Sequence, residues 1–403
     1  MIGFDIEKFV REHVTGRATS LLEADLAAND AEMHRRIDGK RMLVIGGAGT
    51  IGGAYVRAAL RRYRPAAMYV VDIDENQLTE LTRDLRSGNG YTVPEEYVTE
   101  PIDLGSDLFA RFFAAKGPFD IVANFAARKH VRAERDVYSI EAMCETNVFM
   151  AKKLLDLLLK SPPESFFCVS TDKAANPVNV MGATKKLMEE TIMAYADRVN
   201  VKTARFANVA FSNGSLPLGW LNRIAAHQPL SCPLGIRRFF VSPAESGELC
   251  LLAGIMGESG DIVYPRLDPV KDMIGFDQVV KALLSHLGPG CRACTSSAEA
   301  KAAMDDLSQG YPCEFFGSDT DGEKSFEEFF TDHDHRDESR FLNLGVVKNA
   351  RRRPPAEMEA IIANLRNTFH REGVTKQDIV EVLGEYLPDF NHLGRGRGLD
   401  GRM

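Results

Sequence analysis

Residues 42–53 read MLVIGGAGTIGG, and this stretch decides the fold. Met42–Ile45 is a short apolar run of the kind that a buried parallel strand gives, and Ala54–Arg62, after the glycines, reads as a helix. Glycines at positions 46, 49 and 52 permit a tight turn and close packing of that helix on the strand. The stretch therefore predicts a strand, a glycine-rich turn and a helix, which is the first unit of an α/β sheet.

The same turn predicts a dinucleotide site. A second strand, Met68–Val71, ends at Asp72, about twenty residues past the glycines, where a carboxylate can hold a ribose 2′-hydroxyl. The pyrophosphate would lie at the N-terminus of the helix. Asp72 favours NAD over NADP because a carboxylate repels a 2′-phosphate. The residues of the turn that we expect to bind NAD are Gly46, Gly49, Thr50, Ile51 and Gly52.

Two more predicted strands supply further cofactor contacts. Val98–Asp103 reads as a strand whose last residue, Asp103, would face the adenine. Ile121–Ala127 is another buried strand, and it ends in small residues such as Ala126, past which a cofactor can run closely. A basic cluster follows, and it is either a solvated loop or a contact for a phosphate or sugar. Its members are Arg128, Lys129 and His130.

Residues 166–185 read FFCVSTDKAANPVNVMGATK and predict the reactive part of the site. The apolar run Phe166–Val169 is typical of a buried strand, whose carboxyl end faces the ligand crevice of an open α/β sheet. Asp172 and Lys173 follow that end, and a helix beginning near residue 182 would carry Met181 and Lys185 on one face. Polar residues at such ends often only cap or solvate the chain. An acid beside a base favours the catalytic interpretation.

Strands that alternate with helices at this spacing predict an α/β fold with a doubly wound parallel sheet, a Rossmann fold, followed by a smaller C-terminal α+β substrate-binding region. Downstream, Arg237–Val241 pairs cations with aromatic residues, which suits either a diphosphate beside a stackable base or a surface strand. Residues 288–355 look irregular, and helices are expected at about 355–371 and 376–386. The expected divisions are a helical N-terminal extension (1–40), an NAD-binding domain (41–210), a substrate-binding region with C-terminal helices (211–390) and a disordered tail (391–403).

Composition argues against several classes of protein, namely those that bind nucleic acid, insert into membranes or hold a structural metal. The formal net charge of −8 over 403 residues argues against nucleic acid as a partner. No run of eighteen apolar residues and no signal-peptide core occurs, so we expect a cytoplasmic protein without membrane insertion. Seven cysteines without a regular framework suit reduced thiols. Cys291 and Cys294 form one CxxC pair, but a second pair is missing, so we expect no metal site.

The chain resembles the extended short-chain dehydrogenase/reductase superfamily in GGAGTIGG, Asp72, STDKAANPVNVMGATK and ANVAFSNGS. It is most similar there to UDP-N-acetylglucosamine 4,6-dehydratases of polysaccharide biosynthesis. The resemblance covers roughly residues 38–285 and returns at GEKSFEEFF, residues 322–330. It departs from the family pattern at Met181, where a tyrosine is usual. Methionine has no proton to lose, so another group must act as the base, as in the subset of the family that also carries methionine there.

The resemblance implies a redox-neutral reaction with NAD. Oxidation at carbon 4 of a UDP-sugar acidifies carbon 5, an acid and a base eliminate water across carbons 5 and 6, and the hydride returns to carbon 6. It implies that Asp172 is the acid, Lys173 the base and Lys185 the residue that holds the nicotinamide ribose. Thr171 would bind the carbon 4 hydroxyl and Met181 would pack on the sugar. The residues expected at the nucleotide sugar are Lys129, His130, Asn208, Ser215 and Arg238.

Two other functions stay open. One is a 4-epimerase or reductase on the same fold, which needs the missing tyrosine and has no use for Asp172 and Lys173. The other is a catalytically silent protein that binds sugar nucleotides. Product formation from UDP-N-acetylglucosamine separates these alternatives. We also expect a homo-oligomer and a 4-keto-6-deoxy sugar product destined for surface polysaccharide such as lipopolysaccharide.

Overall fold

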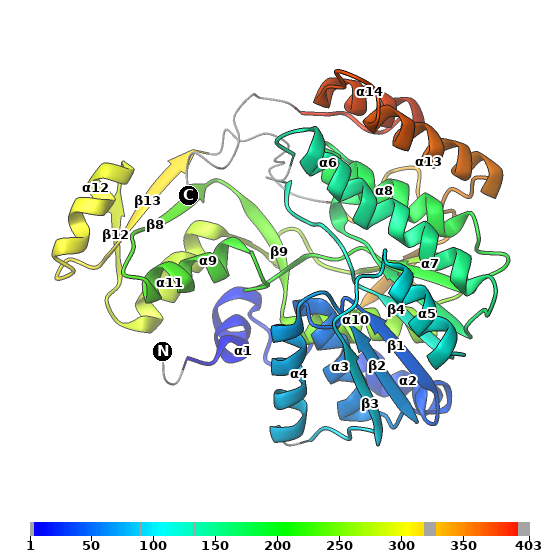
Figure 1. The fold of residues 1–403 in the computed structure, drawn as a ribbon. Coiled ribbons are helices and arrows are strands. Elements are labelled where there is room, and N and C mark those ends of the chain that lie inside the picture. Colours follow the sequence, from blue (N-terminus) through cyan, green and yellow to red (C-terminus); the bar gives the residue numbers. More distant parts are fainter. Residues whose placement is uncertain (1–3, 89, 132–133, 318–327, 394–403) are drawn as a thin grey trace.

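A nine-stranded sheet forms the centre of the computed structural model, which describes residues 4–88, 90–131, 134–317 and 328–393 (Figure 1). Seven neighbouring strands are parallel, and two antiparallel strands extend one edge. β1 lies between β2 and β4, so the strand order reverses there and opens a crevice at the carboxyl ends of the strands. The predicted doubly wound α/β fold is confirmed. In spatial order the strands are β14 (Arg336–Asp337), β15 (Leu344–Val347), β10 (Asp261–Pro265), β6 (Val201–Ala204), β5 (Ser165–Val169), β4 (Ile121–Asn124), β1 (Arg41–Ile45), β2 (Ala67–Val71) and β3 (Glu96–Glu100).

Helices cover both faces of this sheet. On one face α3 (Thr50–Arg62) packs along α10 (Pro243–Met256), and α2 (Glu23–Ile37) packs on α10. The contact between α3 and α10 is close, because a Cβ added at Gly247 would lie 2.3 Å from the backbone of Ala54. The other helices of the sheet are α4 (Glu75–Ser87), α5 (Asp107–Lys116), α6 (Val137–Cys144), α7 (Met150–Leu158) and α8 (Val180–Met193).

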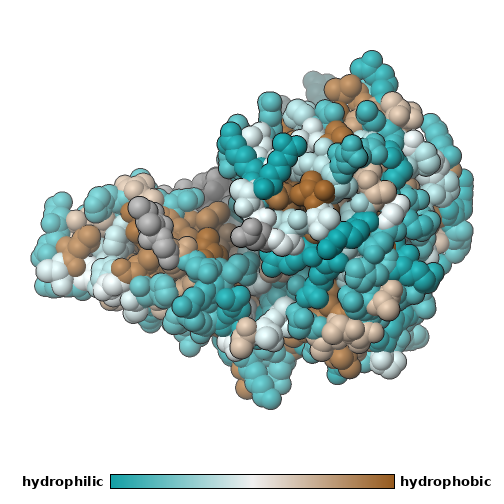
Figure 2. All heavy atoms as spheres, turned by 90° about the horizontal axis from the view of Figure 1, so that it is seen from below, coloured by the Kyte–Doolittle hydropathy of each residue, from teal (hydrophilic) through white to brown (hydrophobic). Residues whose placement is uncertain are grey.

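The smaller part of the molecule projects from the sheet and contains two three-stranded sheets (Figure 1). Apolar side chains gather on its lower face, whereas the larger body is mostly hydrophilic there (Figure 2). One sheet consists of β11 (Met273–Gly275), β9 (Arg237–Val241) and β7 (Asn208–Val209), and the other of β12 (Cys291–Cys294), β13 (Tyr311–Gly317) and β8 (Leu230–Leu234). Its helices are α9 (Leu216–Ala225), α11 (Phe276–Leu287) and α12 (Ser297–Ala302).

The prediction that residues 288–355 are irregular is wrong. This segment supplies β12, β13, α12, β14 and β15. Cys291 and Cys294 lie on strand β12, and all seven cysteines are free thiols. Within the described ranges, no group of three or more His, Cys, Asp or Glu side chains is arranged to hold a metal ion. The GEKSFEEFF motif falls mostly on residues 318–327, outside the described part of the chain.

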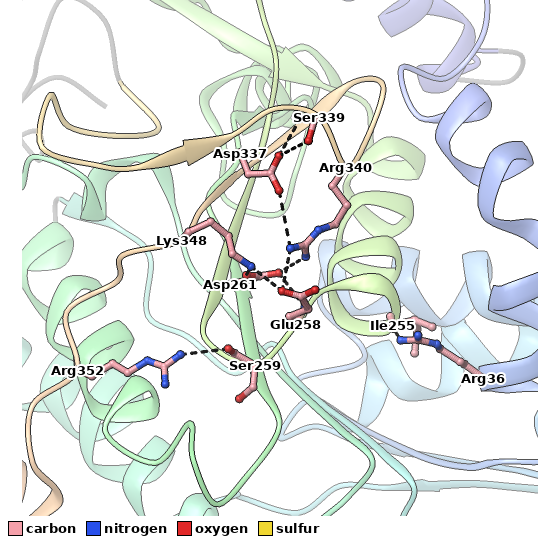
Figure 3. Close-up of polar contacts among 10 residues, drawn as sticks. All are labelled: Arg36, Ile255, Glu258, Ser259, Asp261, Asp337, Ser339, Arg340, Lys348 and Arg352. Carbon is pink, nitrogen blue, oxygen red and sulfur yellow. Dashed lines mark hydrogen bonds and ion pairs between the residues drawn. The ribbon is translucent and has the colours of Figure 1, made fainter.

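An ion network fastens the antiparallel edge to the parallel strands. Lys348 Nζ lies 2.7 Å from Glu258 Oε2 and 2.8 Å from Asp261 Oδ1, and Arg340 Nη2 lies 3.0 Å from the same Glu258 oxygen. Figure 3 shows both cations pointing at the two carboxylates from the chain around β14 and β15. Asp261 is buried at the start of β10. Strands from residues 261–347 therefore complete the sheet that the first half of the chain begins, so the sheet draws on both sides of the expected division at residue 210.

Helices near both ends of the chain pack on this core. The described N-terminal residues form α1 (Ile6–Phe9), a π-helical turn (Val10–Thr15) and α2. Near the other end, α13 (Pro355–Phe369) and α14 (Lys376–Tyr386) pack on α8 and α6 through a separate apolar cluster. Both helices occur where the sequence predicts them. No helix among the described residues has the length and apolarity needed to cross a bilayer.

Candidate active site

A cavity of about 400 Å³ lies at the carboxyl ends of the central strands. It brings together residues from the glycine turn after β1, from the loops after β4, β5 and β6, and from α8. Segments separated by more than a hundred residues thus share one site. The sequence-predicted residues that line it are Gly46, Gly49, Thr50, Ile51, Gly52, Lys129, His130, Thr171, Asp172, Lys173, Met181, Lys185, Asn208 and Ser215.

The glycine turn leaves no room for side chains at two of its positions. Gly46 has a φ of +70°, and a Cβ there would lie 2.5 Å from the backbone nitrogen of Ala126. A Cβ at Gly52 would lie 2.2 Å from the carbonyl oxygen of Gly46. Helix α3 begins immediately after this turn, at Thr50, and its first three residues line the cavity, so its unpaired backbone N–H groups lie close to it. The turn fits the pyrophosphate of a dinucleotide.

Asp72 lies behind this turn. Its Oδ2 accepts a hydrogen bond of 2.9 Å from Ala48 N, and its Oδ1 accepts one of 3.1 Å from Asp74 N. The carboxylate therefore fixes the turn that would carry the phosphates. Four predicted residues are absent from the cavity lining: Asp72, Asp103, Ala126 and Arg238.

Asp103 and Arg238 make contacts outside the cavity. The predicted strand ending at Asp103 instead ends at Glu100, because Asp103 caps a turn in which its Oδ1 accepts a hydrogen bond of 2.8 Å from Gly105 N. Arg238 is buried on β9, and its Nη1 donates to the carbonyl oxygen of Arg237 at 2.9 Å. Phe240, two residues further along β9, does line the cavity.

The turn after β5 carries the acid and the base. Asp172 begins a 3₁₀ turn and is only 4% exposed. Its Oδ1 accepts hydrogen bonds from Thr171 Oγ1 at 2.7 Å, from Lys173 N at 2.9 Å and from Lys173 Nζ at 3.2 Å. Acid, base and hydroxyl are therefore in direct contact at the cavity wall. A proton can move between these groups and a bound molecule without a large displacement.

Helix α8 places two more predicted residues. Lys185 is 3% exposed, and its Nζ donates to the carbonyl oxygen of Val169 at 2.6 Å. Burial lowers the pKa of Lys185, and the neighbouring Cys168 and Glu189 oppose that effect in part. Met181 is buried between the cavity and the apolar cluster that includes residues of α13 and α14. It occupies the expected place, one helical turn before Lys185.

Sequence reasoning missed a buried ion pair beneath this site. Glu189 and Arg205 are each 1% exposed, and Arg205 donates to Glu189 through Nε at 2.9 Å and Nη2 at 2.6 Å. Ser170 Oγ donates to Glu189 Oε1 at 2.6 Å. Burial acts to raise the pKa of Glu189, but the Arg205 guanidinium outweighs it and the pKa falls. The one available signal was the spacing, since Glu189 follows Lys185 by four residues on one helical face.

Asn147 is a second buried polar residue near the site. It lies on a π-helical turn (Glu145–Phe149) between α6 and α7. Its Nδ2 donates to Thr184 Oγ1 and to the carbonyl oxygen of Arg128, both at 3.0 Å, and its Oδ1 accepts from Arg128 N at 2.9 Å. Asn147 thereby joins the loop after β4 to α8.

The loop after β7 closes the cavity over the glycine turn. Asn213 N donates to Thr50 Oγ1 at 3.0 Å. Gly214 has a φ of +72°, and a Cβ there would lie 2.5 Å from the imidazole of His130. Ser215 begins α9 as its N-cap residue. Sequence reasoning singled out His130 and Ser215 but not Asn213, because a contact between backbone and side chain across 163 positions leaves no pattern in the sequence.

A second cavity of about 670 Å³ lies between the chain after β10 and residues 328–338. It is larger, but none of the sequence-predicted site residues lines it. The smaller cavity is therefore the candidate active site, since it alone of the two joins the glycine turn to an acid and a base.

Comparison with known proteins identifies relatives. The chain matches the model of the family described as polysaccharide biosynthesis protein over residues 42–349. An uncharacterized membrane protein of Methanocaldococcus jannaschii is 32% identical over 256 residues, which are 62% of this chain and 72% of that protein. The inverting UDP-N-acetylglucosamine 4,6-dehydratase of Campylobacter jejuni (strain 81-176) is 26% identical, over 69% of this chain and 81% of the enzyme. The matched part spans only 40% of the probable polysaccharide biosynthesis protein EpsC of Bacillus subtilis, at 29% identity over 60% of this chain.

Solved structures have the same fold. Pen from Bacillus thuringiensis superposes with a TM-score of 0.63 at 21% identity, over 81% of this chain and 98% of that chain. DesIV, a dTDP-glucose 4,6-dehydratase from Streptomyces venezuelae solved with NAD and TYD bound, gives 0.51 at 19% identity, over 69% and 88% of the two chains. The family match covers more than half of this chain. The chain therefore belongs to the polysaccharide biosynthesis protein family, and its relatives include proteins named UDP-N-acetylglucosamine 4,6-dehydratase and UDP-glucose 4-epimerase.

Proposed function

We propose that the chain is an NAD-dependent nucleotide-sugar 4,6-dehydratase. Its substrate would be UDP-N-acetylglucosamine or a close relative, and its product a 4-keto-6-deoxy sugar for surface polysaccharide. The observation that carries this proposal is the contact of Asp172 and Lys173 in the cavity that the glycine turn also lines. Elimination of water needs an acid and a base close together. The hydride transfers of an epimerase do not need such a pair.

The cofactor would be held by the turn Gly46–Gly52, in which a Cβ at Gly46 or Gly52 would collide with the backbone. Asp72 would bind the adenosine ribose, and Lys185 the nicotinamide ribose. NAD, when bound, would supply the redox chemistry, which is acceptance of a hydride from carbon 4 and its return to carbon 6. The remaining steps are proton transfers, and they fall to side chains of this protein.

Each proton transfer has a residue in reach. Thr171 hydrogen-bonds the carbon 4 hydroxyl, whose proton passes to Asp172 or to a water. Lys173 takes the proton from carbon 5 and returns a proton there when the hydride reaches carbon 6, and Asp172 protonates the hydroxyl that leaves carbon 6. Thr171 Oγ1 lies 2.7 Å from Asp172 Oδ1, so the first of these transfers has a direct path. Met181 shapes the cavity wall and holds no proton.

The test is incubation of the pure protein with a panel of UDP-sugars, followed by mass spectrometry of the products. A product lighter than UDP-N-acetylglucosamine by one water supports the proposal. An isomer of unchanged mass would establish an epimerase instead. No product from any sugar, with the sugar nucleotide bound, would establish the silent binding protein that the methionine at position 181 keeps open.

The setting of this activity is part of the proposal. UDP-sugars and nicotinamide cofactors both occur in the cytoplasm, and we therefore place the enzyme there, without membrane insertion and as a homo-oligomer. Light scattering of the purified protein measures its mass in solution. A monomer would contradict the expected assembly and leave the chemistry unaffected.

A further inference from the structure

The start of α8 and the turn with Asp172 and Lys173 form one mechanical unit. A Cβ at Gly182 would lie 2.5 Å from the carbonyl oxygen of Lys173, so helix and turn are in tight contact. Gly182 N also donates to Asn179 Oδ1 at 2.8 Å, which caps the helix. A shift of the first turn of α8 toward this carbonyl would therefore displace the backbone of Lys173.

Glu134 holds the first turn of α8 from the side of β4. Its side chain is 6% exposed, and its Oε2 accepts a hydrogen bond of 2.8 Å from Val180 N, the first residue of the helix. A carboxylate at this end also interacts favourably with the helix dipole. Its Oε1 bonds the His392 imidazole and lies 3.1 Å from Lys376 Nζ. Burial acts to raise the pKa of Glu134, but His392, Val180 N and Lys376 outweigh it and lower the pKa.

The segment Asn391–Leu393, here called the strap, holds the other side of the same turn. Asn391 N donates to the carbonyl oxygen of Pro177 at 3.1 Å, and Leu393 N donates to that of Val178 at 3.0 Å. The residue between them, His392, bonds Glu134. The strap therefore grips residues 177–178 by its backbone and residue 180 through Glu134. Glu134 is also connected to α14, because Lys376, the first residue of that helix, lies beside its carboxylate.

We propose that Glu134 and the strap are positioning elements of the active site, which hold the loop 174–180 so that Asp172 and Lys173 meet the substrate in reactive geometry. The inference rests on the proposed function for its catalytic consequence. The strap touches neither the cavity nor Asp172, so it acts through the contact of Gly182 with Lys173. The C-terminal helices thereby acquire a role in catalysis.

Two shortened chains form the matched test. One ends at Leu393 and keeps the strap, and the other ends at Phe390 and lacks it. We expect the chain ending at Phe390 to lose about tenfold to 10²-fold in kcat, since misplacement of a reacting group by about 1 Å has costs of this order. KM and NAD occupancy should stay near those of the full chain. The chain ending at Leu393 should match the full chain in all three quantities.

Hydrogen exchange of the backbone supplies a readout that does not depend on any substrate. In the chain ending at Phe390, amides of residues 174–182 should exchange faster than in the chain ending at Leu393, while those of β1 and β2 stay protected. Equal exchange in the two chains would overturn the proposal even if both make product. If no UDP-sugar reacts, faster exchange still supports the strap, and only the proposed function fails.

Point variants test Glu134, which joins the strap to the first turn of α8. Glu134→Ala should lower kcat as removal of the strap does, and Glu134→Gln, which keeps an acceptor for Val180 N, should recover most of it. His392→Ala should lower kcat in the full chain but change nothing further in Glu134→Ala, because both act through one contact. Additive losses, or a loss in KM alone, would contradict a positioning role. Glu381→Gln, on the exposed side of α14, is the control and should leave kcat unchanged.

Discussion

At the scale of single residues, the contact between Asp172 and Lys173 carries the proposed chemistry. Asp172→Asn and Lys173→Met should each lower product formation by about 10²–10⁴-fold, because each removes one positioned partner of a proton transfer. NAD occupancy should stay unchanged, since the glycine turn, and not this pair, would hold the cofactor. If oxidation at carbon 4 survives, the near-ultraviolet absorbance of bound NADH should appear without product. Asp156→Asn, on the exposed side of α7, is the control, and normal turnover in either active-site variant would exclude its role.

Met181 should contribute shape and no proton. It is 3% exposed, and it packs against both the cavity and the cluster beneath α13. Met181→Leu is close in volume and should keep most activity. Met181→Ala should instead destabilise the fold by about 2–5 kcal/mol, since it leaves a void. Activity assays with denaturant unfolding separate the two effects. A loss near 10³-fold in Met181→Leu, with folding intact, would mean that the thioether takes part in the reaction.

The sequence predicted those site residues that follow a pattern of their own. Gly46 and Gly52 belong to a spaced motif, and Asp172 and Lys173 stand at the end of an apolar strand. The sequence does not predict that Glu189 is buried, because a glutamate on a helix is usually solvated. The ion pair with Arg205 compensates the cost of burying its charge. That partner lies on another strand end. Residues of this kind follow from tertiary contacts and not from local spacing.

At the scale of elements, β6 buries a lysine between two neighbouring strands. Lys202 is 1% exposed, and its Nζ donates to Ser165 Oγ of β5 at 3.1 Å. Burial lowers the pKa of Lys202 from 10.5 to about 7, with Arg36 acting in the same direction and Asp261 of β10 opposing it. Between about pH 7 and pH 10.5, Lys202 is protonated in the unfolded chain but not in the folded chain. The free energy of unfolding should therefore rise with pH across this window, and this contribution is lost as the pH falls toward 7.

Lys202→Met should remove this dependence. Relative to the variant, the wild type should gain up to about 1.4 kcal/mol per pH unit above pH 7, and the variant should be the more stable protein near pH 6.5. Urea unfolding of both proteins between pH 6.5 and 8.5 measures the difference. Lys116→Met, at an exposed position, should follow the wild type at every pH. Parallel curves for Lys202→Met and the wild type would show that Lys202 stays charged in the fold.

The elements themselves were predicted unevenly. β1 and β2 are continuous apolar runs, which a strand buried on both faces must be, and α14 spans the residues expected of it. β12 reads CRAC and is only partly buried, so its sequence carries neither a run nor an alternation of apolar residues. Pairing with β13 creates this strand. Short strands in small sheets depend on pairing with a neighbouring strand. For that reason the sequence after residue 288 predicts an irregular region.

At the scale of the whole molecule, a late segment of the chain adds strands to the nine-stranded sheet that the first half begins. β10 and β15 add to the edge formed by β6, and α10 packs along α3 from the first unit. A division of the sequence at residue 210 separates segments that fold together, since alternation of strands and helices predicts which elements form but not which distant ones pair. The cavity also depends on the smaller part of the molecule, because β9 and the loop after β7 close it.

The assembled cavity leads to a last prediction, which concerns the cofactor. A cycle that borrows a hydride at carbon 4 and returns it at carbon 6 consumes no NAD, so NAD should copurify with the protein and persist through many turnovers. Asp72 fixes the glycine turn through Ala48 N and would meet the 2′-position of the ribose, so NADP should be retained far less. Asp72→Ala should weaken retention of NAD and reduce the discrimination between the two cofactors. Chromatography of the cofactor released by denaturation measures both. Accumulation of one NADH per sugar would exclude a dehydratase, and preferential retention of NADP by the wild type would exclude the role of Asp72.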